Sequence, residues 1–281
     1  MKKILVPTDF SNNSRHALGV AAFIALKTGA KIDIMHSNTI MAYAPPLPEY
    51  AIFDQPDMTQ YYETAADELY EMKREIVENP AFNSLHIETR IEEGFLYTTL
   101  KRVVEEDKID LIIMGTKGAT GATEFFVGSN TEKVIRTAEC PVLAVPEGSG
   151  DFDIRTIVFA TTLRPDQAAA FEYLAEWQKI FSFHVKVIYL NNPAGFDNNA
   201  QIEKSVDTFA AKAWLKNVST FVSGNTFNEE ASILQFAGEQ KADIVAMATH
   251  QRKGLSHLLF GSLTEDTVNH STIPVLCIPA K

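Results

Sequence analysis

The sequence predicts an α/β protein made of two tandem, doubly wound parallel five-stranded sheets of the Rossmann-like kind. Short apolar runs alternate along the whole chain with longer stretches of helical periodicity. The second half of the chain also repeats the pattern of the first. Strands that are apolar on both faces and are separated by helices are typical of parallel sheets that helices cover on both sides.

The repeat has a constant spacing along the chain. Three stretches of the first half recur 133 positions later, namely 114–116 as 247–249, 128–132 as 261–265 and 141–146 as 274–279. The beginning of the chain, residues 4–9, likewise parallels residues 157–162. Because a short polar, glycine-containing stretch, 147–151, separates the copies, we expect one domain at residues 1–148 and a second at 152–281.

The same order of elements is expected in each half. In the first half we predict strands near 2–6, 31–37, 85–91, 109–114 and 141–145, and helices near 12–28, 58–78, 95–107 and 129–138. In the second half we predict strands near 154–160, 183–190, 218–222, 242–247 and 274–278, and helices near 165–181, 198–215, 227–239 and 262–270. Ser11 or Asn12 can cap the first helix.

Composition narrows the classes of function. The 281 residues carry a formal net charge of -11 and neither half is basic, so we expect no nucleic-acid partner. No apolar run approaches the ~18 residues of a membrane span, so we expect no membrane partner. The two cysteines, Cys140 and Cys277, lie in or beside apolar strand-like runs, which predicts buried free thiols and a cytoplasmic location.

A glycine-serine motif follows the fourth predicted strand. It runs Gly115-Thr116-Lys117-Gly118, then nine residues, then Gly128-Ser129-Asn130-Thr131, where a helix is predicted to begin. Glycines let backbone N–H groups approach an anion closely, and a helix N-terminus adds unpaired N–H donors and positive potential. The motif therefore predicts a phosphate site, although glycines that only turn a surface loop are the alternative.

The motif is neither a Walker A loop nor the G-x-G-x-x-G dinucleotide motif. Its spacing, G-x2-G-x9-G-S/T, resembles the ATP-binding motif of the universal stress protein family. Three further stretches are similar to that family in the same order, namely residues 3–11, Glu93-Gly94 and residues 140–146.

The resemblance implies a fold, a ligand and a set of site residues. The implied strand order is 3-2-1-4-5, which places the switch point of the sheet between the first and fourth strands, beside Asp9 and Gly115. The implied ligand is ATP, with Mg2+ bridging its phosphates, although no protein ligand for the ion can be named. The implied binding residues are Pro7, Thr8, Asp9, Ser37, Met114, Gly115, Lys117, Gly118, Gly128, Ser129, Asn130 and Thr131.

These residues have different expected roles. The Pro7-Thr8-Asp9 turn would contact adenine and ribose, Ser37 would lie beside the base, and the glycine motif would hold the phosphates. Asp9 could instead only help to cap a helix, and Lys117 could simply be solvated. No pattern of nucleophile and base is recognisable, so we expect no catalytic residues and no metal site formed by the protein itself.

The second half lacks parts of the motif. Asp9 corresponds to Thr162, Gly115 to Ala248 and Gly118 to Gln251. A Cβ and a long side chain would restrict the loop and crowd the phosphates, so we expect one nucleotide site per chain. The stretch 250–253 is basic, and it is either a solvated loop or a site for another anion or partner.

Two features bear on assembly. The last strand of each half would be an apolar sheet edge that needs cover. In the family that the chain resembles, such edges pair across a dimer, so the two halves are expected to pair with each other as a pseudo-dimer, unless local helices cover each edge. A homodimer of the whole chain remains open. The proline-rich stretch 39–57 could be a lid, a docking surface or a rigid loop.

The resulting hypothesis is an ATP-binding regulatory protein of a stress response, with an adenine nucleotide in the first half. One alternative is an enzyme that hydrolyses ATP slowly or transfers an adenylyl group. The other is an interaction scaffold without nucleotide.

Overall fold

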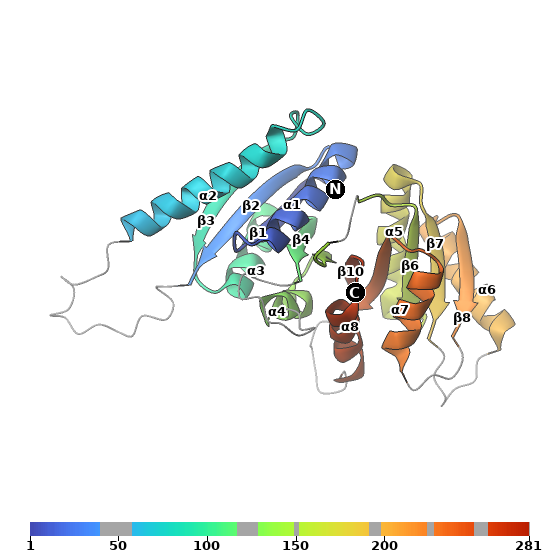
Figure 1. Cartoon of the computed structure of the whole chain (residues 1–281). Helices are drawn as coiled ribbons and strands as arrows, with labels where there is room; N and C mark the ends of the chain where they lie inside the picture. Colours follow the sequence, from blue (N-terminus) through green and yellow to red (C-terminus); the bar gives the residue numbers. More distant parts are fainter. Residues whose placement is uncertain are drawn as a thin grey trace.

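Ten strands in the described part of the chain pair into one continuous sheet, in the order β3-β2-β1-β4-β5-β10-β9-β6-β7-β8 (Figure 1). The structure, a computed structural model, describes residues 1–39, 58–116, 129–148, 152–190, 198–223, 228–249 and 258–280, with the backbone alone at 129 and 258–262. Residues 40–57 of the proline-rich stretch and the basic stretch 250–253 lie outside these ranges. Residues 149–151 of the stretch between the halves also lie outside them.

The elements follow the predicted order in both halves. The first half contains β1 (Lys3–Thr8), α1 (Asn12–Thr28), β2 (Lys31–Asn38), α2 (Thr59–Val77), β3 (Ile87–Glu93), α3 (Leu96–Asp107), β4 (Leu111–Gly115), α4 (Ser129–Thr137) and β5 (Val142–Val145). The second contains β6 (Thr156–Thr161), the 3-10 turn η3 (Pro165–Gln167), α5 (Ala168–Phe181), β7 (His184–Tyr189), α6 (Asn199–Ala213), β8 (Val218–Val222), α7 (Glu229–Glu239), β9 (Ile244–Thr249), α8 (Leu258–His270) and β10 (Val275–Pro279).

Each half is a doubly wound parallel sheet with the strand order 3-2-1-4-5, which confirms the predicted fold class. The halves join where β5 and β10 pair antiparallel, with Leu143 opposite Leu276. The predicted pairing of the two apolar edges is therefore confirmed, and the chain forms its own pseudo-dimer.

Helices cover both faces of the sheet and enclose two apolar layers. Side chains alternate along each strand, so that Ile4 and Val6 of β1 lie in one layer while Leu5 lies in the other. The first layer contains residues of α1, α2, α5 and α6, and the second contains residues of α3, α4, α7 and α8. Burial on both faces explains why the inner strands β1, β4, β5, β6, β9 and β10 are almost continuously apolar.

The two halves also meet through helices on both faces. On one face, Phe23 of α1 stacks with Phe181 of α5 at a centroid distance of 6.3 Å. On the other face, Arg136 of α4 lies 3.6 Å from a carboxylate oxygen of Glu265 on α8. The junction therefore consists of a strand pair between two helix contacts.

Helix α1 begins and ends at the residues that its sequence favours. The hydroxyl of Ser11 accepts a hydrogen bond from the Ser14 N–H, so that Ser11 rather than Asn12 caps the helix. Gly29 ends the helix with φ 71°, in the left-handed region that glycine tolerates best. The equivalent helix of the second half, predicted over 165–181, differs at its start, because its first turn is the 3-10 turn Pro165–Gln167.

Candidate functional site

The candidate site lies at the C-terminal ends of β1 and β4. These neighbouring strands are parallel, with Ile4 opposite Leu111, so that Asp9 and Gly115 follow at the same edge of the sheet. The chain order reverses here, since β2 lies on one side of β1 and β5 lies beyond β4. Ligands of open α/β sheets bind in the crevice at such a switch point.

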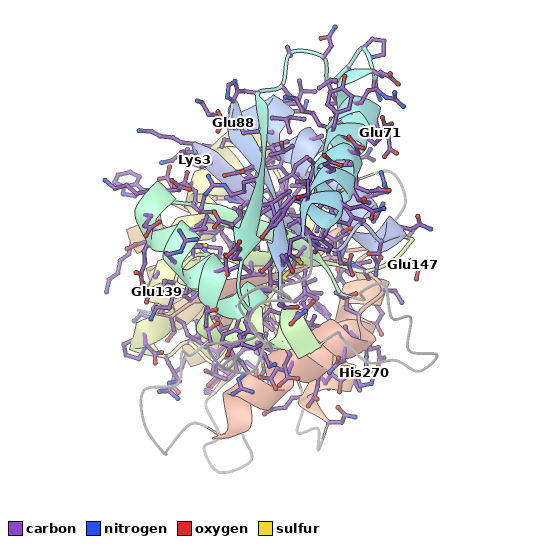
Figure 2. All side chains as sticks on the ribbon, turned by 90° about the vertical axis from the view of Figure 1, so that its left-hand side faces the viewer. Lys3, Glu71, Glu88, Glu139, Glu147 and His270 are labelled. Carbon is purple, nitrogen blue, oxygen red and sulfur yellow. The ribbon has the colours of Figure 1, made fainter. Side chains whose placement is uncertain are left out.

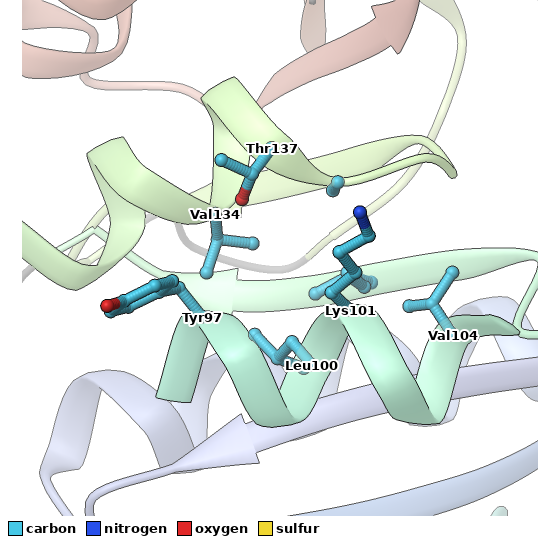
Figure 3. A pocket seen from close by; sticks show the side chains of 8 residues that line it. Tyr97, Leu100, Lys101, Val104, Val134 and Thr137 are labelled. Atoms are coloured by element: carbon cyan, nitrogen blue, oxygen red, sulfur yellow. The ribbon is translucent and has the colours of Figure 1, made fainter. Parts of the chain in front are cut away.

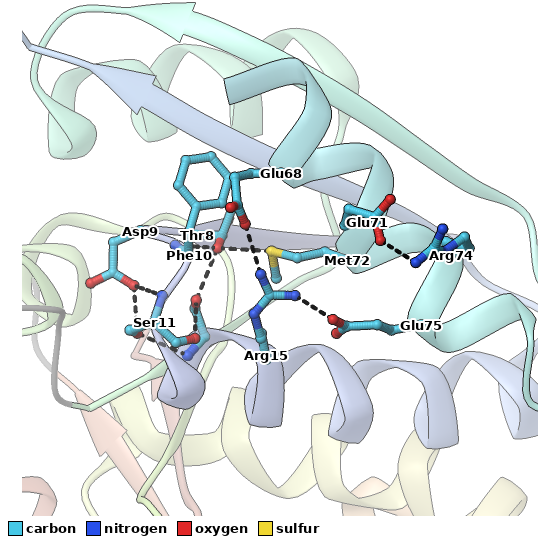
Figure 4. A network of polar contacts seen from close by, with 11 residues as sticks. Thr8, Asp9, Phe10, Ser11, Arg15, Glu68, Glu71, Met72, Arg74 and Glu75 are labelled. Atoms are coloured by element: carbon cyan, nitrogen blue, oxygen red, sulfur yellow. Dashed lines mark hydrogen bonds and ion pairs between the residues drawn. The ribbon is translucent and has the colours of Figure 1, made fainter. Parts of the chain in front are cut away.

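A compact turn fixes Asp9 after β1 (Figure 4). The exposed Asp9 accepts hydrogen bonds on Oδ1 from the N–H (3.1 Å) and the hydroxyl (2.6 Å) of Ser11. The buried Thr8 hydroxyl lies 2.9 Å from that of Ser14 and accepts the N–H of Phe10. Asp9 therefore orients the cap of α1 while its carboxylate remains at the open edge of the sheet.

An aromatic cluster lies beside this turn. Phe10, with φ 65°, stacks on His36 at the end of β2 with ring centroids 4.4 Å apart. His36 Nδ1 lies 3.0 Å from the Thr8 carbonyl oxygen, and Nε2 lies 2.7 Å from the hydroxyl of Tyr61 on α2. These partners assign the Nδ1–H to the carbonyl and the Tyr61 O–H to Nε2. Burial raises the pKa of the Tyr61 hydroxyl, which keeps it in the donor form.

Gly115 and α4 form the other wall. An atom at the Cβ position of Gly115 would lie only 3.1 Å from Asn13 on α1, so that glycine permits the close approach of helix and strand. The buried Thr131 hydroxyl donates a 3.0 Å hydrogen bond to the Gly115 carbonyl. This bond ties the first turn of α4, which begins at Ser129, to the end of β4. The unpaired N–H groups of that turn and the helix dipole favour an anion.

The remaining predicted residues are placed as follows. Pro7 is buried within β1, and Met114 is buried within β4 in the apolar layer of α3 and α4. The Ser37 hydroxyl donates a 2.7 Å hydrogen bond to the Gly94 carbonyl. Asn130 is exposed on the first turn of α4. Lys117, Gly118 and Gly128, together with the Ser129 side chain, lie outside the described residues.

The structure therefore brings Asp9, Gly115 and the start of α4 to one edge of the sheet, with Ser37 on the neighbouring strand β2. Sequence reasoning missed Asn13, Phe10 and Tyr61 as parts of this edge. Phe10 is the neighbour of Asp9, and Asn13 is the neighbour of the cap candidate Asn12. Their closeness in sequence to these residues was the one signal that could have identified them. Tyr61 comes from a helix distant in sequence, for which no local pattern exists.

In the second half, Gln167 holds the equivalent turn. The buried Gln167 Oε1 accepts hydrogen bonds from the Thr161 hydroxyl (2.7 Å) and from the N–H groups of Thr162 (3.2 Å) and Arg164 (3.3 Å). Thr161 and Gln167 take the positions of Thr8 and Ser14, because β1 and β6 correspond residue by residue in the repeat and pair with their neighbours in the same register. One carboxamide thus holds this turn, whereas the first half uses the hydroxyls of Ser11 and Ser14.

A small recess between α3 and α4 is too small for a ligand (Figure 3). Its volume of about 10 Å³ is at the lower limit for one water molecule. It is lined by Tyr97, Leu100, Lys101, Val104, Ile112, Val134, Thr137 and Ala138.

The described ranges contain neither a cluster of metal ligands nor a membrane-spanning helix. No group of three or more His, Cys, Asp and Glu side chains in these ranges could hold a metal ion. None of the helices in the part of the chain that the structure describes is both long and apolar enough to cross a membrane. Both cysteines are free and buried, as predicted.

Known proteins share this sequence pattern and this fold. The model of the universal stress protein family matches residues 1–146 and, a second time, residues 153–279. A Staphylococcus aureus (strain USA300) protein that bears the family's name is 30% identical over 164 residues, which make up 58% of this chain and 95% of that protein.

Two solved structures are similar over nearly the whole chain. A universal stress protein from Archaeoglobus fulgidus DSM 4304 aligns with a TM-score of 0.72 and 18% identity, covering 99% of this chain and 96% of its own. One from Pseudomonas aeruginosa UCBPP-PA14 aligns with a TM-score of 0.67 and 16% identity, covering 100% and 94%. At 18% and 16% identity, the similarity to these two structures shows the fold alone. The family membership follows from the match of the sequence to the family model. The chain belongs to the universal stress protein family and carries two family domains in tandem.

Proposed function

We propose that the first half binds ATP, as its complex with Mg2+, and that the second half binds no nucleotide. One contrast carries the proposal. In the first half an exposed carboxylate, Asp9, lies at the switch point, whereas the equivalent residue of the second half is the uncharged Thr162, whose N–H donates to Gln167. Two copies of one fold thus differ where a ligand of this fold class binds.

The residues present at this edge suit a nucleoside phosphate. A carboxylate at Asp9 can accept hydrogen bonds from ribose hydroxyls, and the resemblance adds contacts of the Pro7-Thr8-Asp9 turn with the base. The first turn of α4, held against β4 by Thr131, would receive the phosphates, with Mg2+ neutralising part of their charge. Because the Thr131 hydroxyl donates to Gly115, we expect Thr131 to contribute its backbone N–H. The resemblance adds Lys117, Gly118 and Gly128.

Occupancy could be passed to the second half through α4. The helix begins at the proposed phosphate site, and Arg136 in its last turn pairs with Glu265 of α8. ATP would then favour one arrangement of the junction over another by binding it more tightly. This route supports a regulatory protein of a stress response.

Calorimetry with ATP and Mg2+ tests the proposal. Gly118→Gln gives the first half the residue of the second half, and we expect it to abolish binding. The reverse exchange, Gln251→Gly, serves as the matched control and should leave the affinity unchanged. Unchanged affinity in Gly118→Gln would refute the site assignment, and no binding by the unaltered chain would favour the scaffold.

The same samples test the enzyme alternative. Release of phosphate, or of AMP and pyrophosphate, is measured after prolonged incubation with ATP and Mg2+. A binding protein leaves ATP intact. Turnover that disappears in Gly118→Gln would instead assign an ATP-cleaving activity to the same site.

A further inference from the structure

The two outer edges of the sheet differ in charge. β3 and β8 are equivalent outermost strands of the two halves. β3 has the sequence Ile-Glu-Thr-Arg-Ile-Glu-Glu, and Figure 2, which looks at the molecule from this side, shows Glu88 on it. β8 has the sequence Val-Ser-Thr-Phe-Val and carries no charge. Charged residues protect an edge strand from pairing with another chain, and β8 lacks that protection.

The helices that pack on these strands differ in the same way. α2, which packs on β3, carries five acidic residues and two basic residues, namely Glu63, Asp67, Glu68, Glu71 and Glu75 against Lys73 and Arg74. α6, which packs on β8, is balanced, with Glu203 and Asp207 against Lys204 and Lys212. α7, which contacts β8 through Phe236, carries Glu229, Glu230 and Glu239 and no basic residue. Because β3 and α2 are both acidic while β8 and α6 carry no net charge, two copies that met at β3 would repel each other more strongly than two copies that met at β8.

One pair of equivalent residues emphasises the contrast. Arg90 on β3 is engaged by Asp33 (2.5 Å) and Asp107 (2.7 Å). The equivalent residue of β8 is Phe221, which stacks on Phe236 of α7 at 4.6 Å and is still 47% exposed. The ring therefore exposes part of its apolar surface beside the uncharged edge.

The backbone of β8 offers hydrogen bonds outward. In its ladder with β7, the Val185 N–H donates to the Asn217 carbonyl and the Ser223 N–H donates to the Tyr189 carbonyl, each at 3.0 Å. The backbone N–H and C=O groups of the odd-numbered residues of β8 therefore point toward β7. In a parallel ladder the N–H and C=O groups of the alternate residues Val218, Thr220 and Val222 point away from it.

We propose that β8 pairs antiparallel with β8 of a second copy of this chain, about a two-fold axis at Thr220. Thr220 would lie opposite Thr220 of the second copy, and Val218 would lie opposite the second copy's Val222. Every outward N–H and C=O group of these three residues would then have a hydrogen-bond partner. Ser219 would face the second copy's Phe221, which brings the two Phe221 rings within diagonal contact.

A second copy fits this edge because the edge is self-complementary. The chain already joins its own two halves in this way, since the uncharged strands β5 and β10 pair antiparallel. Because the contact is two-fold symmetric, it uses β8 of both copies and forms a dimer without a free β8 edge. The joined sheet then has β3 of one copy at each end, where the charged residues oppose the addition of a further chain. One strand pair with one aromatic contact is small for an interface, so we expect a weak dimer that depends on concentration.

Sedimentation velocity on the full chain, from the micromolar to the millimolar range, measures this equilibrium. We expect Thr220→Lys to weaken the dimer by roughly tenfold or more, because two lysines would face each other at the axis. Thr89→Lys is the matched control, since Thr89 is exposed at the equivalent position of β3, and it should leave the dimer unchanged. Thr220→Pro removes an outward N–H without loss of a bond to β7 and is a second disrupting variant.

Hydrogen exchange on the unaltered chain provides a readout that needs no variant. The amides of Val218, Thr220 and Val222 should gain protection as the concentration rises, while those of Ser219 and Phe221 should change little. A monomer at every concentration would overturn the proposal, as would a dimer that Thr89→Lys weakens and Thr220→Lys does not, or a dimer without this alternating protection.

Discussion

Gly115 lies against Asn13 where β4 ends and α1 begins. An atom at the Cβ position of Gly115 would lie 3.1 Å from the carbonyl carbon, the carbonyl oxygen and the Cβ of Asn13. In the second half, Ala248 stands at the position of Gly115, and the equivalent helix begins with the 3-10 turn Pro165–Gln167. The added methyl group and the altered first turn thus occur together at the same contact.

Gly115→Ala should therefore displace the first turn of α1. Because backbone atoms of Asn13 must move, we expect a loss of about 1–2 kcal/mol in the free energy of unfolding. ATP affinity should fall as well, since the turn that carries Asp9 moves with the helix. Urea denaturation and calorimetry measure the two effects.

Gly19→Ala within α1 is the control for this substitution. Nothing lies within 4 Å of a Cβ at Gly19, so the variant should be as stable as the parent or more stable by up to about 1 kcal/mol. A Gly115→Ala protein as stable as Gly19→Ala would contradict the importance of the close contact.

Asp9→Ala should remove most of the ATP affinity at little cost in stability. The hydrogen bonds that Asp9 accepts from Ser11 are exposed, so we expect the free energy of unfolding to fall by less than about 1 kcal/mol. Ser11→Ala separates the two roles of the turn, because it removes the helix cap, at about 1 kcal/mol, and keeps the carboxylate. Calorimetry should show a greater loss of affinity for Asp9→Ala than for Ser11→Ala. The opposite order would mean that Asp9 acts through the cap alone.

Gln167→Ala should destabilise the second half. It leaves the buried Thr161 hydroxyl and two backbone N–H groups without their shared acceptor, for which we expect a cost of about 2–3 kcal/mol. Ser14→Ala, the matched change in the first half, removes fewer hydrogen bonds and should cost about 1 kcal/mol. Equal losses in denaturation experiments would argue against a greater role of Gln167 in holding its turn.

Both cysteines should be unreactive in the folded protein. Burial raises the pKa of Cys140 from 9.0 to about 12 and also raises that of Cys277, so that neither forms the reactive thiolate near neutral pH. A thiol reagent at pH 8 should modify both residues after unfolding and neither before it. Rapid modification of the folded protein would contradict their burial.

The same shift predicts how stability depends on alkaline pH. Because the pKa of Cys140 is higher in the folded state, the unfolded state releases its proton first as the pH rises above 9.0. The free energy of unfolding should therefore fall between pH 9.0 and about 12, and it should fall less in Cys140→Ala. Equal slopes for the two proteins would contradict the raised pKa.

Much of the fold could be predicted because it depends on local periodicity and on the repeat. The alternation of apolar strands and helices predicted the elements, and the two uncharged last strands predicted the pairing of β5 with β10. The first turn of α5 was not predicted, because a helical pattern alone does not reveal that Gln167 folds back on the strand before it.

The candidate site was predicted less completely. The strand order that the resemblance implies placed Asp9 and Gly115 at one edge, and the structure has this order. The contact of Gly115 with Asn13 and the bond of His36 to Tyr61 join residues that are far apart in sequence, and no local pattern encodes them. Similarly, the bond from Ser37 to Gly94 depends on how the end of β2 meets the turn after β3.

The number of ATP molecules bound per chain tests the proposed division of labour between the halves most directly. Native mass spectrometry and calorimetry with Mg2+ should both find one ATP per chain, with binding lost in Asp9→Ala and retained in Thr162→Ala. Two ATP molecules per chain, or one that Thr162→Ala removes and Asp9→Ala does not, would contradict it.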